Sequence, residues 1–511
     1  MSASLASTKI SVRPLYDPIT FGLGCFEIIV GLGALLLADY VPIFDLLAVV
    51  AGLLGVFALI YCIVNPESLK VYDLFGAILL FGYGSGALNT VASLYLDHQE
   101  ITSPSATAQY WLTQTLALVL CVCGFIHLIG RLDGGGYLLR LGDSNRKEAT
   151  RVMMFVVPIF LLYVALLATG RIGFMATVSD DGGKSVSPIA VFALLLATPA
   201  GALALSVALR ISRSAFSLGL IAISILLLLL QFGLGRRTFV FSAVIYLLCI
   251  LLVKRPKKLI SFKNIVMLAA AMLAVYIVTM GFYAMRLAAW SMSGRGNQNY
   301  SVMELIPKAI EVYSQDRRGR LEAKSAKNVK MRTFVLEYLS EISKGVSERE
   351  PLYGEDLHRA LIVATPSLFY PSKIQDNLFE PEEPLINPAF GLPVFDGPNS
   401  ILTAGAADFG VVGMFLYPFV FCVTLSALLR GAYRYAPPIV GLLFGLFICQ
   451  LVLNVETDIA QCLASLRSII PVVLIAWFYF SVGTGKATVA YPMRGHTNFN
   501  TPAKTFTPEL K

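Results

Sequence analysis

Apolar stretches of about twenty residues recur from one end of this chain to the other, and each is long enough to cross the hydrocarbon core of a bilayer as a helix. Lipid offers no partner for a free backbone N–H or C=O group, so a spanning segment must be a helix or a strand of a closed barrel. Barrel strands alternate apolar and polar residues, whereas runs such as Leu226 to Leu230 do not alternate. The chain is therefore predicted to be an all-α polytopic membrane protein.

The composition supports this class. Of the 511 residues, 56% are hydrophobic and only 14% are charged, whereas a soluble chain of this length is roughly a quarter charged. We predict about twelve transmembrane helices from the length of the apolar stretches. They lie near residues 19–38, 46–64, 72–93, 110–130, 152–170, 189–209, 216–234, 238–253, 264–286, 408–429, 437–455 and 462–482.

Lys and Arg are distributed unevenly among the short loops. The loops after the fourth, sixth, eighth and tenth predicted spans are rich in them, as in 254–263, whereas alternate loops such as 97–100 are poor. Because positively charged loops stay in the cytoplasm, both termini are predicted to be cytoplasmic. The net charge of +8 follows from this orientation, and no nucleic-acid partner is expected.

The pattern of spans predicts four parts. Residues 1–290 hold the first nine spans, 291–397 form a large external (periplasmic) loop domain, 398–483 hold the last three spans, and 484–511 form a disordered cytoplasmic tail. The external domain is expected to be mostly helical, and one of its amphipathic helices is predicted near 302–313 and another near 332–342.

The tenth span has an irregular sequence. Apolar residues run from Ile401 to Leu429, which is too long for one straight crossing. Three glycines interrupt this run, namely Gly405, Gly410 and Gly413. We therefore expect 398–407 to be an external or interfacial segment and the span itself to begin at Asp408, near the outer membrane surface.

Several arginines lie at the outer ends of predicted helices, against the usual distribution of positive charge. They are Arg171, Arg236, Arg237, Arg286 and Arg467. A guanidinium presents a planar fork of N–H donors that binds phosphate bidentately and stays charged when partly desolvated. Several of them at one membrane depth favour binding of a diphosphate at the level of the lipid headgroups. The alternative for each arginine is that it extends to lipid phosphates or pairs with a nearby carboxylate.

The external domain adds further candidates. His358 is its only histidine, and Arg359 follows directly. A histidine with a pKa near neutrality can take a proton from an attacking hydroxyl, although His358 can equally be a surface residue. Arg332 in the second amphipathic helix and Lys373 are the other basic candidates, and Asp408 introduces the tenth span.

Glu27 lies inside the first predicted span, where it is either an interhelical hydrogen-bond partner or a site residue. The remaining histidines, His127 among them, have no predicted role. The sequence has no metal-ligand cluster, phosphate-binding loop or nucleotide fingerprint, so we expect no metal and no cofactor.

Together these features resemble the Wzy-type polymerases of O-antigen and exopolysaccharide repeat units. The resemblance covers most of residues 70–480 and includes the number of spans, the position of both ends and the large external loop late in the chain. Its motifs are the Gly235-Arg236-Arg237 turn, Arg332 in a loop helix, Gly354 followed by Pro366-Ser367 and Lys373, and Asp408-Phe409-Gly410-x-x-Gly413.

The resemblance implies a GT-C-like, metal-independent inverting glycosyltransferase in a bacterial inner membrane, with its active site facing the periplasm. Its substrates would be oligosaccharides linked to undecaprenyl diphosphate. The growing glycan would pass from its lipid diphosphate to a hydroxyl of a newly delivered repeat unit. The implied partners are a chain-length regulator (co-polymerase) and a repeat-unit flippase.

The resemblance also implies roles for the candidate residues. Arginines would stabilise the leaving diphosphate, and a base would deprotonate the acceptor. The implied catalytic residues are His358, Arg237 and Arg286, and the implied diphosphate ligands are Arg236, Arg237, Arg286, Arg332 and Arg467. Further substrate-site candidates are Arg171, Arg359, Lys373 and Asp408.

Two alternative functions are compatible with the same sequence. An O-antigen ligase shares the topology and the diphosphate donor but moves the glycan to the lipid A core. A multi-pass transporter shares the number of spans, but the two halves of this chain show no repeat and the middles of its spans lack charged residues, where transporters commonly bind substrate.

Overall fold

The computed structural model describes most of the chain, and every regular element in that part is a helix. The described residues are 18–39, 43–96, 106–133, 136–142, 146–169, 188–211, 214–231, 236–254, 273, 277, 280–282, 284–289, 302–315, 335–366, 369–370, 383–392 and 399–482.

The described helices follow one another along the chain, and several neighbours are joined by only a few residues, as between α15 and α16. They are α1 (Pro18–Leu37), α2 (Phe44–Val64), α3 (Val71–Leu96), α4 (Ala106–Leu132), α5 (Arg146–Ala168), α6 (Pro188–Ala208), α7 (Ala215–Leu230), α8 (Arg236–Lys254), α10 (Val302–Gln315), α12 (Val335–Glu348), α13 (Glu355–Ala364), α14 (Glu383–Phe390), α15 (Ile401–Tyr435), α16 (Pro438–Val452) and α17 (Ile459–Ser481).

Eight of the described helices, α1 to α6, α15 and α17, are long and apolar enough to cross a bilayer, and α7, α8 and α16 are shorter apolar helices. Large apolar side chains cover their surfaces: Ile29, Leu36 and Phe478 are 68%, 74% and 75% exposed. Water disfavours so much apolar surface, whereas lipid accepts it. The predicted class, an all-α polytopic membrane protein, is confirmed.

Each predicted span except the ninth falls on a described helix. The ninth, predicted at 264–286, lies mostly outside the described residues. The count of about twelve spans and the cytoplasmic position of both ends therefore stay predictions.

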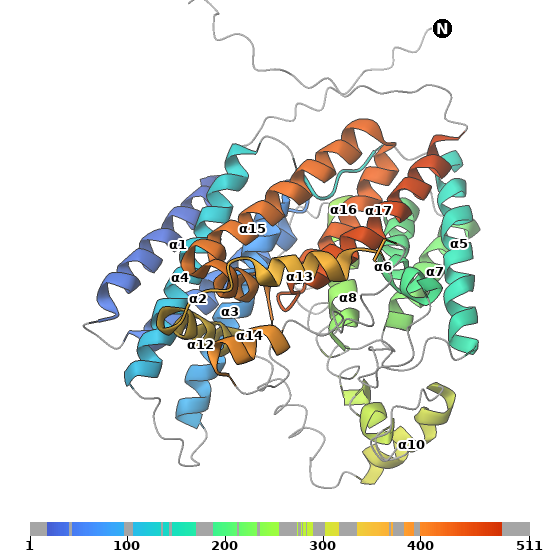
Figure 1. Cartoon of the computed structure of the whole chain (residues 1–511). Helices are drawn as coiled ribbons and strands as arrows, with labels where there is room; N and C mark the ends of the chain where they lie inside the picture. Colours follow the sequence, from blue (N-terminus) through green and yellow to red (C-terminus); the bar gives the residue numbers. More distant parts are fainter. Residues whose placement is uncertain are drawn as a thin grey trace, which may run out of the picture.

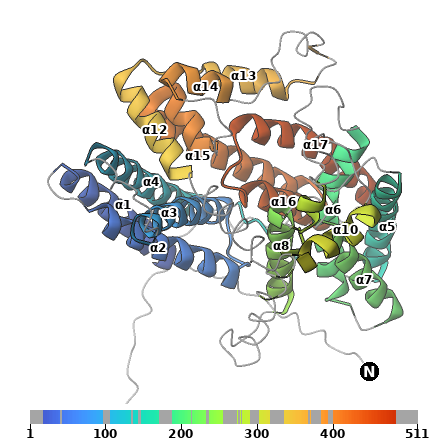
Figure 2. The same ribbon diagram turned by 90° about the horizontal axis from the view of Figure 1, so that it is seen from below.

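The apolar helices form two groups joined by a third. Figure 2 shows α1–α4 on one side, α5–α8 on the other and α15–α17 between them. The helix α16 packs on α3, α6 and α8, and almost all of its residues are buried, as expected for a helix that is apolar all round.

Small residues allow the backbones of α2 and α3 to approach closely. A Cβ added at Gly84 of α3 would lie 2.7 Å from the carbonyl oxygen of Ala51 in α2.

Three helices from the predicted external loop, α12, α13 and α14, lie together along one side of this bundle (Figure 1 and Figure 2). The helix α12 packs on α15, α4 and α3, where the hydroxyl of Thr90 donates a hydrogen bond to Glu337 at 3.0 Å. The helix α13 packs on α17 and α15. Part of the predicted external domain is therefore attached directly to the apolar bundle.

The helix α15 bends sharply within its first third. Phe409 and Gly410 have non-helical backbone angles, and the φ of Gly410 is +60°. Gly405 and Gly413 are in backbone contact, although eight residues of unbroken helix would separate them by about 12 Å. The segment 398–407 was expected to be external or interfacial. From Ile401 to Asp408 the chain forms a helix that is buried along its whole length before the bend.

We expect a side chain at Gly405 to force the two parts of α15 apart, because its Cβ would overlap the carbonyl oxygen of Gly413. Overpacking of this kind costs about 1–3 kcal/mol or more. Gly405→Val should lower the apparent melting temperature of the purified protein in detergent, measured by the monodisperse fraction after heating. Gly431→Ala in the same helix is the matched control, since open space surrounds it. Equal melting temperatures for both variants would contradict the close contact.

Candidate functional site

The start of α13 is held against the bend of α15 by backbone hydrogen bonds. The N–H of Leu352 donates to the carbonyl of Ala407, and the N–H of Tyr353 donates to the carbonyl of Asp408, both at 2.9 Å. Tyr353 and Gly354 then adopt positive φ values of 52° and 90°, and Gly354 provides no side-chain cap for the helix that follows. The left-handed turn at glycine sends the chain directly into α13.

The cap that Gly354 lacks is supplied by Asp408, from another part of the chain. Its carboxylate accepts the N–H of Asp356 on Oδ1 and the N–H of Leu357 on Oδ2, each at 3.0 Å. The hydroxyl of Tyr417 also donates to Oδ2, and Asp408 is fully buried. These bonds satisfy orphan N–H groups at the helix start, where the helix dipole also favours negative charge.

The other end of α13 is bound by Arg467 of α17. One guanidinium N–H of Arg467 donates to the carbonyl oxygen of Ala364 at 2.9 Å. The carbonyls of the last helical turn lack partners within the helix, and a cation is favoured there. The helix α13 is therefore held at both ends, by the acidic Asp408 of α15 at its start and by the basic Arg467 of α17 at its end. Each charge has the sign that the helix dipole favours at that end.

A buried carboxyl group lies beneath the start of α13. Asp356 has no exposed surface, and neither of its oxygens has a hydrogen-bond partner among the described residues. Burial, and after it the charges of Asp408 and Asp458, raise the pKa of Asp356 to about 8, while Arg359 opposes this shift. Burial also raises the pKa of Asp458, which accepts the N–H of Gln461 at the start of α17.

The structure brings together four of the residues singled out in the sequence. His358 is exposed on α13 and Arg359 is half-buried on the same helix, between Asp408 at one end and Arg467 at the other. Arg286 is half-buried in the helical segment 284–289. Arg171, Arg332 and Lys373 lie outside the described residues, and the side chains of Arg236 and Arg237, at the start of α8, are likewise outside the description.

Sequence reasoning named Asp408 but assigned no role to Asp356, Asp458 or Tyr417. One local signal was available for Asp356. It shares the buried face of α13 with Ala360, four residues further on, and a carboxylate on the buried face of an amphipathic helix is rare unless it has a role. Its neighbours Asp408 and Asp458 are distant in sequence and give no such signal.

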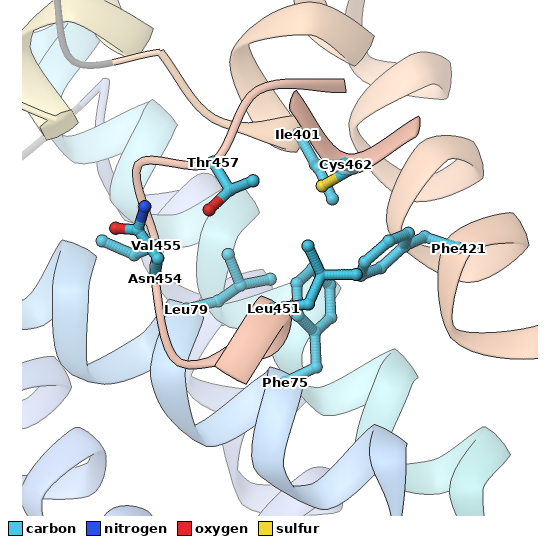
Figure 3. Close-up of a pocket in the computed structure, with 9 residues that line it drawn as sticks. All are labelled: Phe75, Leu79, Ile401, Phe421, Leu451, Asn454, Val455, Thr457 and Cys462. Atoms are coloured by element: carbon cyan, nitrogen blue, oxygen red, sulfur yellow. The ribbon is translucent and has the colours of Figure 1, made fainter. Parts of the chain in front are cut away.

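A small cavity lies close to this group of residues but is a separate feature (Figure 3). It is lined by Phe75, Leu79, Ile401, Phe421, Leu451, Asn454, Val455, Thr457 and Cys462. Its walls are mostly apolar, with one amide and one hydroxyl side chain. The loop before α17 contributes both to this cavity and to the group of residues around α13, through Asp458. None of the candidate arginines whose side chains are described lines the cavity.

Glu27 has a buried partner. The Nδ1 atom of His127 in α4 lies 2.8 Å from Oε2 of Glu27 in α1, and both side chains are buried. A Cβ at Gly76 of α3 would lie 2.6 Å from the imidazole, so this glycine makes room for the ring. Glu27 is thus an interhelical partner, and His127, for which we predicted no role, joins two helices.

We expect Asp408→Ala to loosen α13, because two backbone N–H groups lose their acceptor. Loss of a cap costs about 1–2 kcal/mol, which corresponds to roughly a tenfold rise in local opening. Hydrogen exchange of a peptide covering 355–365 measures this opening. Glu348→Ala, at the exposed end of α12, is the control that should leave the exchange of α13 unchanged. The same exchange rate in Asp408→Ala and in the unmodified protein would show that the cap contributes nothing.

The described residues contain no group of three or more His, Cys, Asp or Glu side chains placed to hold a metal ion.

Comparison with known proteins gives no further assignment. Neither a protein-family model, nor a curated protein, nor a solved structure matches the chain.

Proposed function

We propose that this protein is a polysaccharide polymerase of a bacterial inner membrane. It transfers a growing glycan from undecaprenyl diphosphate to a lipid-linked repeat unit at the periplasmic face, without a metal ion and with inversion at the anomeric carbon. The observation that supports this best is that α13 is bonded at both ends to an all-α membrane bundle, to Asp408 at its start and to Arg467 at its end. The helix between them carries His358 and Arg359.

Arg467 has the chemistry that a diphosphate requires. A guanidinium carries five N–H donors, and Arg467 uses one of them on Ala364 while its side chain is exposed. Arg359 adds a second guanidinium from α13. In the proposal, Arg236, Arg237, Arg286 and Arg332 complete the set of diphosphate ligands, and their charge replaces a divalent metal.

The proposed reaction is a single displacement. The acceptor hydroxyl oxygen attacks the anomeric carbon, and the bond from that carbon to the diphosphate oxygen breaks. The hydroxyl proton passes to His358, and the undecaprenyl diphosphate leaves with its charge stabilised by arginines. A helix held at both ends suits this role, because a base must stay within hydrogen-bond reach of the hydroxyl.

The topology belongs to the same proposal. About twelve spans with both ends in the cytoplasm place α12, α13 and α14 in the periplasm, where flipped repeat units arrive. A repeat-unit flippase would deliver the acceptor, and a chain-length regulator would act on the product.

The arginines of the 235–237 turn provide the main test. In cells that depend on this protein for polymer, Arg236→Ala or Arg237→Ala should lower polymer by at least about a hundredfold, the usual effect of removing a group that stabilises transition-state charge. Lipid-linked single units should accumulate. Arg146→Ala, exposed at the start of α5, is the matched control and should leave polymer unchanged. Polymer of normal amount and length in both test variants would refute the diphosphate role.

His358→Ala tests the base. We expect a loss of transfer of about 10²–10⁴-fold with donor binding retained, since only the proton acceptor is removed. Transfer rates on purified protein and binding of the lipid-linked donor are the two measurements. An unchanged rate would exclude His358 as the base. Glu355→Gln, at an exposed position of the same helix, is the control for general damage to α13.

A second candidate function is transport, and the buried Glu27–His127 pair is the observation that favours it. Ionisable side chains inside transmembrane helices often mark a pathway for protons or other ions. If the protein is a transporter, reconstituted vesicles should accumulate substrate without any polymer, and Glu27→Gln should abolish this uptake. An O-antigen ligase would instead be identified by transfer to lipid A core rather than to a repeat unit.

A further inference from the structure

The carboxyl group of Asp356 occupies an unusual place in the docking of α13. Its own backbone N–H donates to Asp408, so the two carboxyl groups lie at adjacent positions in a buried contact. Neither oxygen of Asp356 has a hydrogen-bond partner among the described residues. A charged carboxylate in such a place costs several kcal/mol, whereas a neutral carboxylic acid costs far less.

The charged groups around Asp356 come from each element that packs there. From the bend of α15 comes Asp408, whose carboxylate accepts two backbone N–H groups and the Tyr417 hydroxyl. From the loop before α17 comes Asp458, and Glu355 of α13 adds a third like charge. Among the described residues, only Arg359, one turn along α13, opposes them. The surroundings therefore disfavour ionisation of Asp356.

We propose that α13 is a proton-dependent latch, which docks on α15 and α17 while Asp356 is protonated and is released when Asp356 loses its proton. Release would free the helix that carries His358 and Arg359. The inference is independent of the glycosyl-transfer proposal, because it concerns only how α13 is held.

The direction of the pH effect follows from the number of bound protons. Released α13 exposes Asp356 to water, where its pKa returns to about 4. Between that value and the raised pKa in the docked state, docking requires uptake of one proton. The docking equilibrium constant should therefore fall by up to about tenfold for each pH unit across this interval, and stay constant above it.

Hydrogen exchange of the segment 353–365, corrected for the intrinsic pH dependence of amide exchange, tests the latch in the full-length protein in lipid nanodiscs. Protection should fall by about tenfold per unit between pH 5.5 and 7.5 in the unmodified protein. In Asp356→Asn, which stays neutral at every pH, protection should persist and show no such decline. Peptides from α16 report whether each variant is folded.

Three further variants separate Asp356 from its neighbours. Glu355→Gln and His358→Gln should keep the decline, since these exposed side chains are not buried by docking. Asp458→Asn, which can still cap α17, removes a like charge and should move the end of the decline to lower pH.

Several results would overturn the latch. They are a flat profile in the unmodified protein, the same decline in Asp356→Asn, or loss of the decline in His358→Gln. Loss of α13 protection in Asp356→Asn at every pH, with α16 still protected, would equally contradict it, because a neutral side chain should keep the latch closed.

Discussion

The carboxylate of Asp408 is the interaction on which the position of α13 depends. It accepts two backbone N–H groups of α13 and one hydroxyl from its own helix, and it is completely buried. It reaches that position because α15 bends at Phe409 and Gly410, next to a contact of two glycines that admits no side chain. Because of this bend, a residue of the long apolar helix α15 caps the start of α13.

This arrangement changes how the outer arginines are interpreted. Arg467 stabilises the end of α13, so its presence at the end of a span has a structural explanation as well as a chemical one. Both can hold, because a guanidinium has donors to spare after one bond. Arg359 differs, since its charge acts on the buried Asp356 and opposes the rise of the pKa of that carboxyl group.

Much of the fold could be predicted because hydropathy is a local property. Each apolar stretch requires a helix by its own composition, and the predicted spans coincide with the described helices almost throughout. The glycines at 405, 410 and 413 also predicted an irregular span. The direction of the bend, and the burial of 401–408, depend on contacts with other helices and could not be read from the sequence.

In the candidate site, too, residues that are close in sequence could be predicted together, whereas residues that are far apart in sequence could not. His358 and Arg359 are adjacent, so one motif presented both, whereas Asp356 meets Asp408 across 52 residues and His127 meets Glu27 across 100. Such pairs arise from tertiary packing, and the spacing of residues in one sequence does not predict them. A buried acid beside a capping carboxylate is visible only in three dimensions.

Glycan transfer at the face that carries α13 can be tested directly by reconstituting the purified protein. Purified protein in nanodiscs is supplied with a single undecaprenyl-diphosphate-linked repeat unit and no other protein, and the products are resolved by size. We expect a ladder of products that differ by one repeat unit, with one undecaprenyl diphosphate released for each glycosidic bond formed. A repeat unit that stays unchanged, in a preparation whose folding is verified by hydrogen exchange, would contradict it.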